Sequence, residues 1–137
     1  MKMSQEVKSH YYKGLLVLLR RDRVIDDRER DLMLQIGEIL GFDRRFCEAA
    51  IDELMSNTNI TRDPVVFSDE TIKACFLRDA VRLALIDGEL HPSELRWLRV
   101  VAHVNGLTDP WLDDVIKQIR EKNPAQDDAP FEIQQHL

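Results

Sequence analysis

The sequence predicts an all-α protein of six helices, arranged as two related units of three helices each. Three observations predict this fold class. Apolar residues recur at helical spacing along most of the chain, helix start and stop residues flank those stretches, and the two halves of the chain align without a gap. The chain has 137 residues, which fits one domain large enough to bury a core.

Three helices are predicted in the first half, covering 6–21, 27–40 and 44–55. Asp26 precedes the second helix and Glu29 follows three residues later, which is the spacing of a capping box. Gly41 comes after the second helix, where a left-handed residue commonly ends a helix. The third helix follows Asp43, and its inward face is expected to hold Phe46, Cys47, Ala50, Ile51 and Leu54.

Three more helices are predicted in the second half, covering 69–86, 92–105 and 109–121. Ser68 is expected to cap the first of them, and His91 is the nominal N-cap of the second, with Pro92 at its first helical position. Glu94 then falls at the third position of that helix, and Gly106 ends it. Trp97 and Trp111 fall on helical apolar stripes, so we expect both to pack in the core.

A shift of 65 residues aligns the two halves. Asp22 then falls on Asp87, Glu29 on Glu94 and Gly41 on Gly106, while apolar residues fall on apolar residues. A generic amphipathic helix would match the stripes but not the acids and glycines in register. We therefore predict a single domain over 1–122, built of units at about 4–57 and 66–122 and a linker at about 58–65. Residues 123–137, with two prolines, are predicted to be a flexible tail.

The two stretches 22–29 and 87–94, which we call the acidic corners, connect the first two helices of each unit. Two interpretations are open. In the first, Asp22 and Asp87 hold the turn while Glu29 and Glu94 complete capping boxes. In the second, the corners bind a hard divalent cation, Ca²⁺ or Mg²⁺, through carboxylate oxygens. The candidate metal ligands are Asp87, Glu89 and Glu94 in the second corner, and Asp22, Asp26 and Glu29 in the first.

Two further points bear on the cation. If the first and fourth helices packed antiparallel, Asp69 and Glu70 would approach Asp22, and Glu6 would approach Asp87. The second corner also matches half of an EF-hand loop, but Leu83 and Leu85 would then occupy the first ligand positions and cannot coordinate. The corner is therefore not an EF-hand.

The turn Asp87-Gly88-x-Leu90-x-x-x-Glu94, between one amphipathic helix and another that ends in glycine, resembles the TerB-type domain. Such domains occur in tellurite-resistance proteins and in DjlA-type membrane-anchored co-chaperones. The resemblance covers about 6–120 and is clearest over 84–106. It implies a duplicated all-α fold and metal binding by loop acids, here Asp87 and Glu94 and, more weakly, Asp22 and Glu29. His91 and Arg23 depart from the pattern, which has a small capping residue and a glycine there.

From this resemblance we expect a non-enzymatic stress-response module, related to tellurite resistance, with a divalent-cation site. The alternative is a metal-free protein–protein adaptor of the co-chaperone type. That adaptor would bind its protein partner through Val65-Val66-Phe67 or through the tail around Phe131 and Ile133.

Composition excludes several other classes. A net charge of −6 argues against nucleic acid as a partner, and the longest apolar run, Leu15 to Leu19, is too short to span a membrane. Cys47 and Cys75 have no metal or disulfide spacing, so we expect buried, reduced thiols in a cytoplasmic protein. The four histidines are not paired at a spacing that would bind zinc. No nucleophile or phosphate-loop motif suggests an enzyme.

Overall fold

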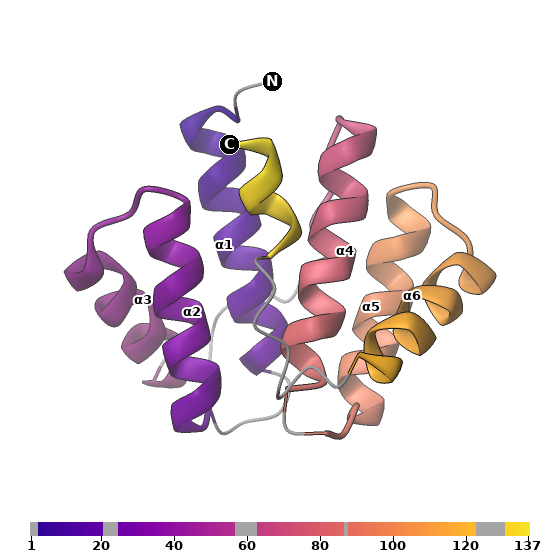
Figure 1. Cartoon of the computed structure of the whole chain (residues 1–137). Coiled ribbons are helices and arrows are strands. Elements are labelled where there is room, and N and C mark those ends of the chain that lie inside the picture. The colour runs from indigo at the N-terminus through magenta and orange to yellow at the C-terminus, as the bar shows by residue number, and fades with distance from the viewer. Residues whose placement is uncertain (1–2, 21–24, 57–62, 87, 123–130) are drawn as a thin grey trace.

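The computed structural model describes residues 3–20, 25–56, 63–86, 88–122 and 131–137, and all regular structure in these residues is helical. The described elements are α1 (Gln5–Arg20), α2 (Asp27–Ile39), α3 (Arg44–Ser56), α4 (Glu70–Ala84), α5 (Pro92–Val104), α6 (Asp109–Glu121) and the 3₁₀ helix η1 (Glu132–His136). The predicted all-α class with six helices is therefore confirmed. Figure 1 shows α1 and α4 side by side in the centre, with α2 and α3 on one side and α5 and α6 on the other.

The observed helix ends lie close to the predicted ones, with one difference at the start of α4. The N-cap is Asp69, whose Oδ1 accepts a hydrogen bond from the backbone N–H of Ile72 at 2.9 Å, and not Ser68 as predicted. A carboxylate is a stronger acceptor than a hydroxyl and also interacts favourably with the positive end of the helix dipole. The cap therefore falls one residue later than the prediction.

The two central helices, α1 and α4, approach closely because α1 carries a glycine at the crossing. A Cβ atom on Gly14 would lie 2.8 Å from the ring of Phe76, so a larger residue does not fit there. The ring centroids of Tyr11 and Phe76 are 5.2 Å apart, and those of Phe76 and Trp97 are 6.4 Å apart. This chain of aromatic contacts joins α1, α4 and α5 into one hydrophobic core.

Figure 1 and the residues that gather at one end of the pair show that α1 and α4 run in the same direction. Glu6 and His10 of α1 line the same surface pocket as Asp69 and Ile72 at the start of α4. The antiparallel arrangement considered from the sequence is therefore wrong. Consequently the acids near the start of α4 lie at the opposite end from the acidic corners.

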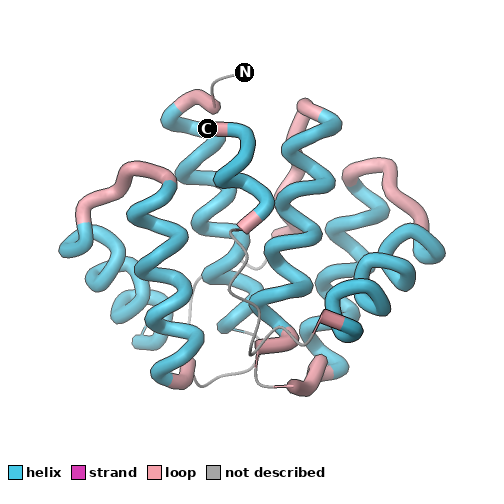
Figure 2. Tube along the Cα trace, viewed as in Figure 1, coloured by secondary structure: helices cyan, strands magenta, loops and turns pink. Residues whose placement is uncertain are grey.

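Equivalent elements in the two halves have the same length and the same spacing. Helices α2 and α5 each contain 13 residues and begin 65 residues apart, and the same is true of α3 and α6. Gly41 and Gly106 are both left-handed, with φ of 89° and 78°. The next residue in each half donates its N–H over 2.8 Å, from Phe42 to the carbonyl of Gly37 and from Leu107 to that of Ala102. Figure 2 shows the loops collected at the two ends of the helices.

The C-terminal residues differ from the predicted flexible tail. Residues 131–137 include η1, which packs on α4, and Phe131 and Ile133 are only 3% and 0% exposed. In Figure 1, η1 lies across α1 and α4. Two apolar side chains and an acceptor on α4 explain why this short segment is held in place. Residues 123–130 lie outside the described part of the chain.

Two other expectations concern single residues and membrane spans. Cys47 and Cys75 are free thiols and both are buried, as expected. Among the described helices, none combines the length and the apolar character that crossing a membrane requires.

Candidate functional site

The described part of the first acidic corner forms the predicted capping box. Asp26 Oδ1 accepts the N–H of Glu29 at 2.8 Å, and Glu29 Oε1 accepts the N–H of Asp26 at 3.2 Å. Glu29 is only 4% exposed, although it is a charged residue at the start of a helix. Its carboxylate satisfies a backbone donor that α2 leaves without an intrahelical partner.

The second acidic corner repeats this arrangement at Glu94. Its Oε1 accepts the N–H of His91 at 3.2 Å, and the residue is 1% exposed. Pro92 opens α5, and Gly88 adopts a left-handed φ of 87° in the turn before it. Glu89 is exposed on the surface of the corner. The capping roles expected for Glu29 and Glu94 are thus both present.

The structure brings the two corners to the same end of the molecule. In Figure 1 the starts of α2 and α5 both lie at the lower end, and Arg28 Nη1 donates to the carbonyl of Ile86 at 3.4 Å. Asp22 and Asp87, the first candidate metal ligands of the corners, lie outside the described residues. Within the described ranges, no three His, Cys, Asp or Glu side chains are grouped as a metal site would require.

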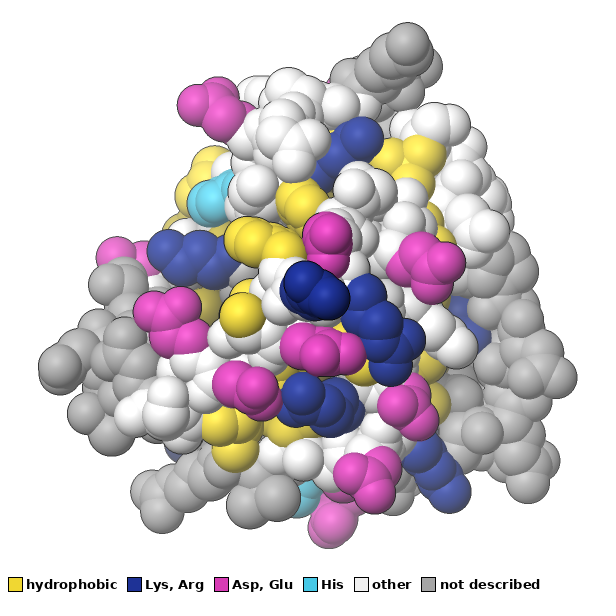
Figure 3. Space-filling view, turned by 90° about the vertical axis from the view of Figure 1, so that its left-hand side faces the viewer, with side chains coloured by type: hydrophobic (Ala, Val, Ile, Leu, Met, Phe, Trp, Pro, Cys, Tyr) yellow, Lys and Arg dark blue, Asp and Glu magenta, His cyan; other side chains and the backbone are white. Residues whose placement is uncertain are grey.

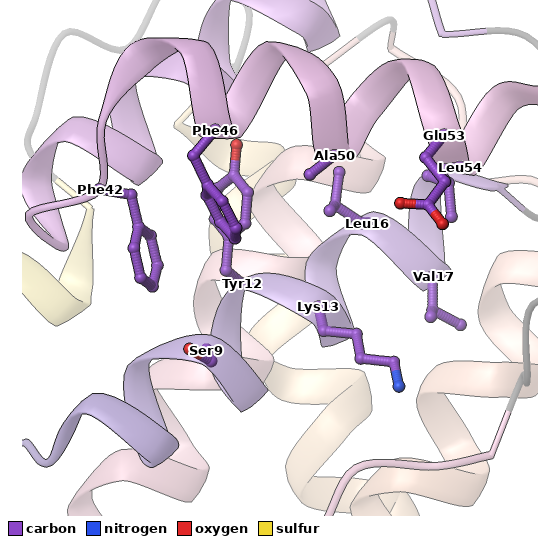
Figure 4. A pocket seen from close by; sticks show the side chains of 10 residues that line it. All are labelled: Ser9, Tyr12, Lys13, Leu16, Val17, Phe42, Phe46, Ala50, Glu53 and Leu54. Atoms are coloured by element: carbon purple, nitrogen blue, oxygen red, sulfur yellow. The ribbon is translucent and has the colours of Figure 1, made fainter.

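A second candidate site is the apolar groove between α1 and α3, which has a volume of about 400 Å³ (Figure 4). Mostly apolar side chains line it: Tyr12, Leu16, Val17, Phe42, Phe46, Ala50 and Leu54, together with Ser9, Lys13 and Glu53. The Phe42 ring lies 5.6 Å from that of Tyr12 and 5.4 Å from that of Phe46. The hydroxyl of Tyr12 donates to the carbonyl of Met33 at 2.9 Å, which fixes this wall of the groove.

Phe46 does not occupy the inward position predicted for it. It is 53% exposed, whereas Cys47, Ile51 and Leu54 on the same helix are buried. These three residues fill the contact with α1 and α2, so Phe46 falls beside the contact and opens onto the groove. Figure 3, which views the molecule from the side of the first three helices, shows hydrophobic side chains exposed between interleaved acidic and basic ones.

The equivalent position in the second half is covered. Trp111 and Arg78 stand 65 residues after Phe46 and Lys13, and the Arg78 guanidinium lies 5.6 Å from the Trp111 ring centroid. Such a cation–π contact shields the indole from water. Among the described residues no corresponding contact joins Lys13 to Phe46. Trp111 is therefore half-buried where Phe46 is exposed, while Trp97 is in the core as predicted.

The third candidate is the buried carboxylate of Asp79, which was not predicted from the sequence. Asp79 is 1% exposed and accepts three hydrogen bonds: from the Tyr11 hydroxyl at 2.6 Å, the Glu132 N–H at 2.7 Å and the Ile133 N–H at 3.2 Å. Burial raises the pKa of Asp79 to about 6, while these hydrogen bonds act in the opposite direction. Burial, reinforced by Asp79, also raises the pKa of Tyr11.

A sequence signal for Asp79 does exist. It stands three residues after Phe76 and four before Leu83, so helical spacing places it on the buried face of α4. A carboxylate on such a face needs partners, and these come from 53 to 68 residues away along the chain. The spacing could therefore have indicated a buried acid, but not what binds it.

The surfaces predicted for an adaptor are mostly buried. Asn105 accepts the N–H of Phe67 at 2.9 Å and donates to the carbonyl of Val65 at 2.8 Å, which anchors this segment against α5. Val65 and Phe67 are each 5% exposed, and Phe131 and Ile133 are buried as described above. Only Val66 of the first segment, at 55% exposure, faces outward. A partner would therefore have to bind elsewhere.

Comparisons with known proteins return no match for this chain among family models, curated proteins or solved structures.

Proposed function

We propose that this chain is a non-enzymatic, TerB-like interaction module of two related three-helix units, which binds an amphipathic helix of a partner protein in its α1/α3 groove. The observation that carries the proposal is the exposed aromatic wall of that groove. A phenylalanine that is 53% exposed beside an apolar cavity leaves hydrophobic area in water, which a partner would remove. The equal helix lengths and the 65-residue spacing support the repeat.

The shape and lining of the groove favour a helix as the occupant. A partner helix with an apolar stripe docks in such a groove through side chains spaced by one turn, and a volume of about 400 Å³ is suited to a few of them. Lys13 comes from α1 and Glu53 from α3, on opposite sides of the groove (Figure 4). The complementary helix therefore carries an acidic residue on one flank and a basic residue on the other. Reversing a helix exchanges its flanks, so these charges select one docking direction.

The experiment uses a synthetic amphipathic peptide with a Leu/Phe stripe, a glutamate flank and a lysine flank, titrated by fluorescence anisotropy. We expect Phe46→Asp to weaken binding by about ten-fold or more, because the groove then contains a charge without a partner. Val100→Asp is the matched control, since Val100 is 48% exposed on α5, away from the groove. If both variants bind the peptide equally, or neither differs from the unmodified chain, the groove is not the binding site.

A second candidate function is divalent-cation binding by the acidic corners. The observation that favours it is the burial of two equivalent carboxylates, Glu29 and Glu94, at the same end of the molecule. In this hypothesis Ca²⁺ or Mg²⁺ takes oxygen ligands from the six corner acids Asp22, Asp26, Glu29, Asp87, Glu89 and Glu94, and neutralises their charge.

Calorimetric titration of the unmodified chain with Ca²⁺ and with Mg²⁺ tests this second function. The control is the variant with Asp87→Asn and Glu94→Gln, which keeps the side-chain size but removes two charges. We expect saturable heat only for the unmodified chain. Identical heats for both proteins would leave the acids with a capping role alone.

A further inference from the structure

Residues 131–137 occupy a crevice between α1 and α4, and the contacts there are those of a ligand in a binding site. Asp79 Oδ1 accepts the N–H of Glu132 at 2.7 Å, and Asp79 Oδ2 accepts that of Ile133 at 3.2 Å. Both donors are backbone groups, so the carboxylate recognises two successive amides regardless of the side chain at 132. The Tyr11 hydroxyl, at 2.6 Å from Oδ2, holds the carboxylate in position.

Two apolar side chains supply the remaining contacts of this segment. The Arg82 guanidinium lies 4.5 Å from the Phe131 ring centroid, and Phe131 is 3% exposed. Ile133 is completely buried, whereas Gln134 and Gln135 are exposed. The crevice therefore recognises an aromatic residue and an aliphatic residue two positions later, with the amides of the second and third residues bound to Asp79.

We propose that this crevice, which we call the Asp79 crevice, is a binding site for peptide segments of the pattern aromatic-x-aliphatic, and that residues 131–137 fill it as a displaceable ligand. The partner is a protein segment of that chemistry, which competes with the chain's own C-terminal residues. The proposal is independent of the α1/α3 groove, because the two sites share no lining residue.

The segment is suited to displacement because few contacts hold it and the rest of the core is complete without it. It forms a 3₁₀ helix of only five residues, with two buried anchors. The central contacts between Tyr11, Phe76 and Trp97 are made entirely by α1, α4 and α5. Segments with few buried contacts open at lower free energy than the helices they cover.

The test uses the full-length chain with its own segment weakened by Ile133→Asp. A synthetic peptide with the sequence of residues 129–137 is titrated against this variant and against the matched control Gln134→Asp, which adds the same charge at an exposed position. We expect Ile133→Asp to bind the peptide at least about ten-fold more tightly than the control, whose crevice is still filled. Adding Asp79→Asn to Ile133→Asp should abolish that gain, as should a peptide with alanine at the Phe131 and Ile133 positions.

Three outcomes would overturn the proposal. The first is that folded Ile133→Asp binds the peptide no better than Gln134→Asp, and the second is that Asp79→Asn leaves binding unchanged. The third is that Ile133→Asp loses its helical circular dichroism, because the segment would then be part of the required core. Hydrogen exchange on the unmodified chain gives an independent reading. The amides of Glu132 and Ile133 should exchange at least about ten-fold faster than interior amides of α4, and equal rates would contradict a displaceable segment.

Discussion

At the scale of single residues, Asp79 connects three parts of the chain through one buried side chain. Its carboxylate joins the α1 hydroxyl of Tyr11 to the backbone of residues 132 and 133. A buried carboxylate is costly unless donors surround it, and here three donors do so. Because its pKa is raised to about 6, the protonation state of this group affects stability below neutral pH.

The first prediction concerns the pH dependence caused by Asp79. Its folded-state pKa of about 6 lies above the model value of 3.8, so the folded protein binds the proton more tightly than the unfolded chain. The stabilising contribution is therefore complete below pH 4 and is lost as pH rises through 6. We expect the free energy of unfolding, relative to that of Asp79→Asn, to fall by about 3 kcal/mol from pH 4 to pH 7.

Urea denaturation of both proteins across this pH range measures the difference. The ionisable groups facing Asp79 are Tyr11, Cys75 and Glu132, and burial raises the pKa of the Tyr11 hydroxyl and of the Cys75 thiol, the latter to about 12. Both therefore stay protonated in the window. A difference that stays constant with pH, or that increases with pH, would show that the hydrogen bonds outweigh burial at this carboxylate.

The second prediction concerns Gly37, which lies in the middle of α2. A Cβ atom there would collide with Sγ of Cys47 and would lie 3.3 Å from the Tyr12 ring. We expect Gly37→Ala to lower the free energy of unfolding by about 1–3 kcal/mol, as overpacking does, although alanine favours helices. Cys47→Ala in the same chain should recover part of this loss, because it removes the colliding atom. An additive double variant in urea denaturation would contradict the account.

At the scale of the helices, local sequence signals determine where elements begin and end. The third prediction is that Asp26→Ala costs about 1 kcal/mol of stability, because α2 loses the acceptor for the Glu29 N–H. Asp27→Asn removes a charge from the same helix end but no printed cap contact, so it should cost only a few tenths of a kcal/mol. Thermal unfolding compares them, and equal losses would mean that charge, and not the cap, stabilises this end.

The helix ends also show what could be predicted from sequence. The capping boxes at Asp26 and His91 and the left-handed Gly41 and Gly106 depend on residues within a few positions, so the prediction is confirmed there. The exposure of Phe46 could not be predicted, because it depends on how α3 is rotated against α1. The docking of 131–137 depends on a carboxylate 53 residues away, which no local pattern contains.

At the scale of the whole molecule, the two halves share one core. Helices α1 and α4 run in the same direction at its centre, and each carries the other two helices of its half on the outer side (Figure 1). This arrangement puts both acidic corners at one end and leaves the α1/α3 groove on an outer side. Both proposed functions depend on these positions, so the shared core is the central claim.

The most direct test of that claim measures how damage in the first half affects the second. Met33 is completely buried in α2, and Met33→Ala should cost about 2–5 kcal/mol. Both tryptophans lie in the second half, so their fluorescence reports on that half alone, while circular dichroism reports on all helices. We predict that Met33→Ala moves the urea midpoints of fluorescence and circular dichroism down together, in one transition. A fluorescence midpoint that keeps the value of the unmodified chain while the circular dichroism midpoint falls would contradict a shared core.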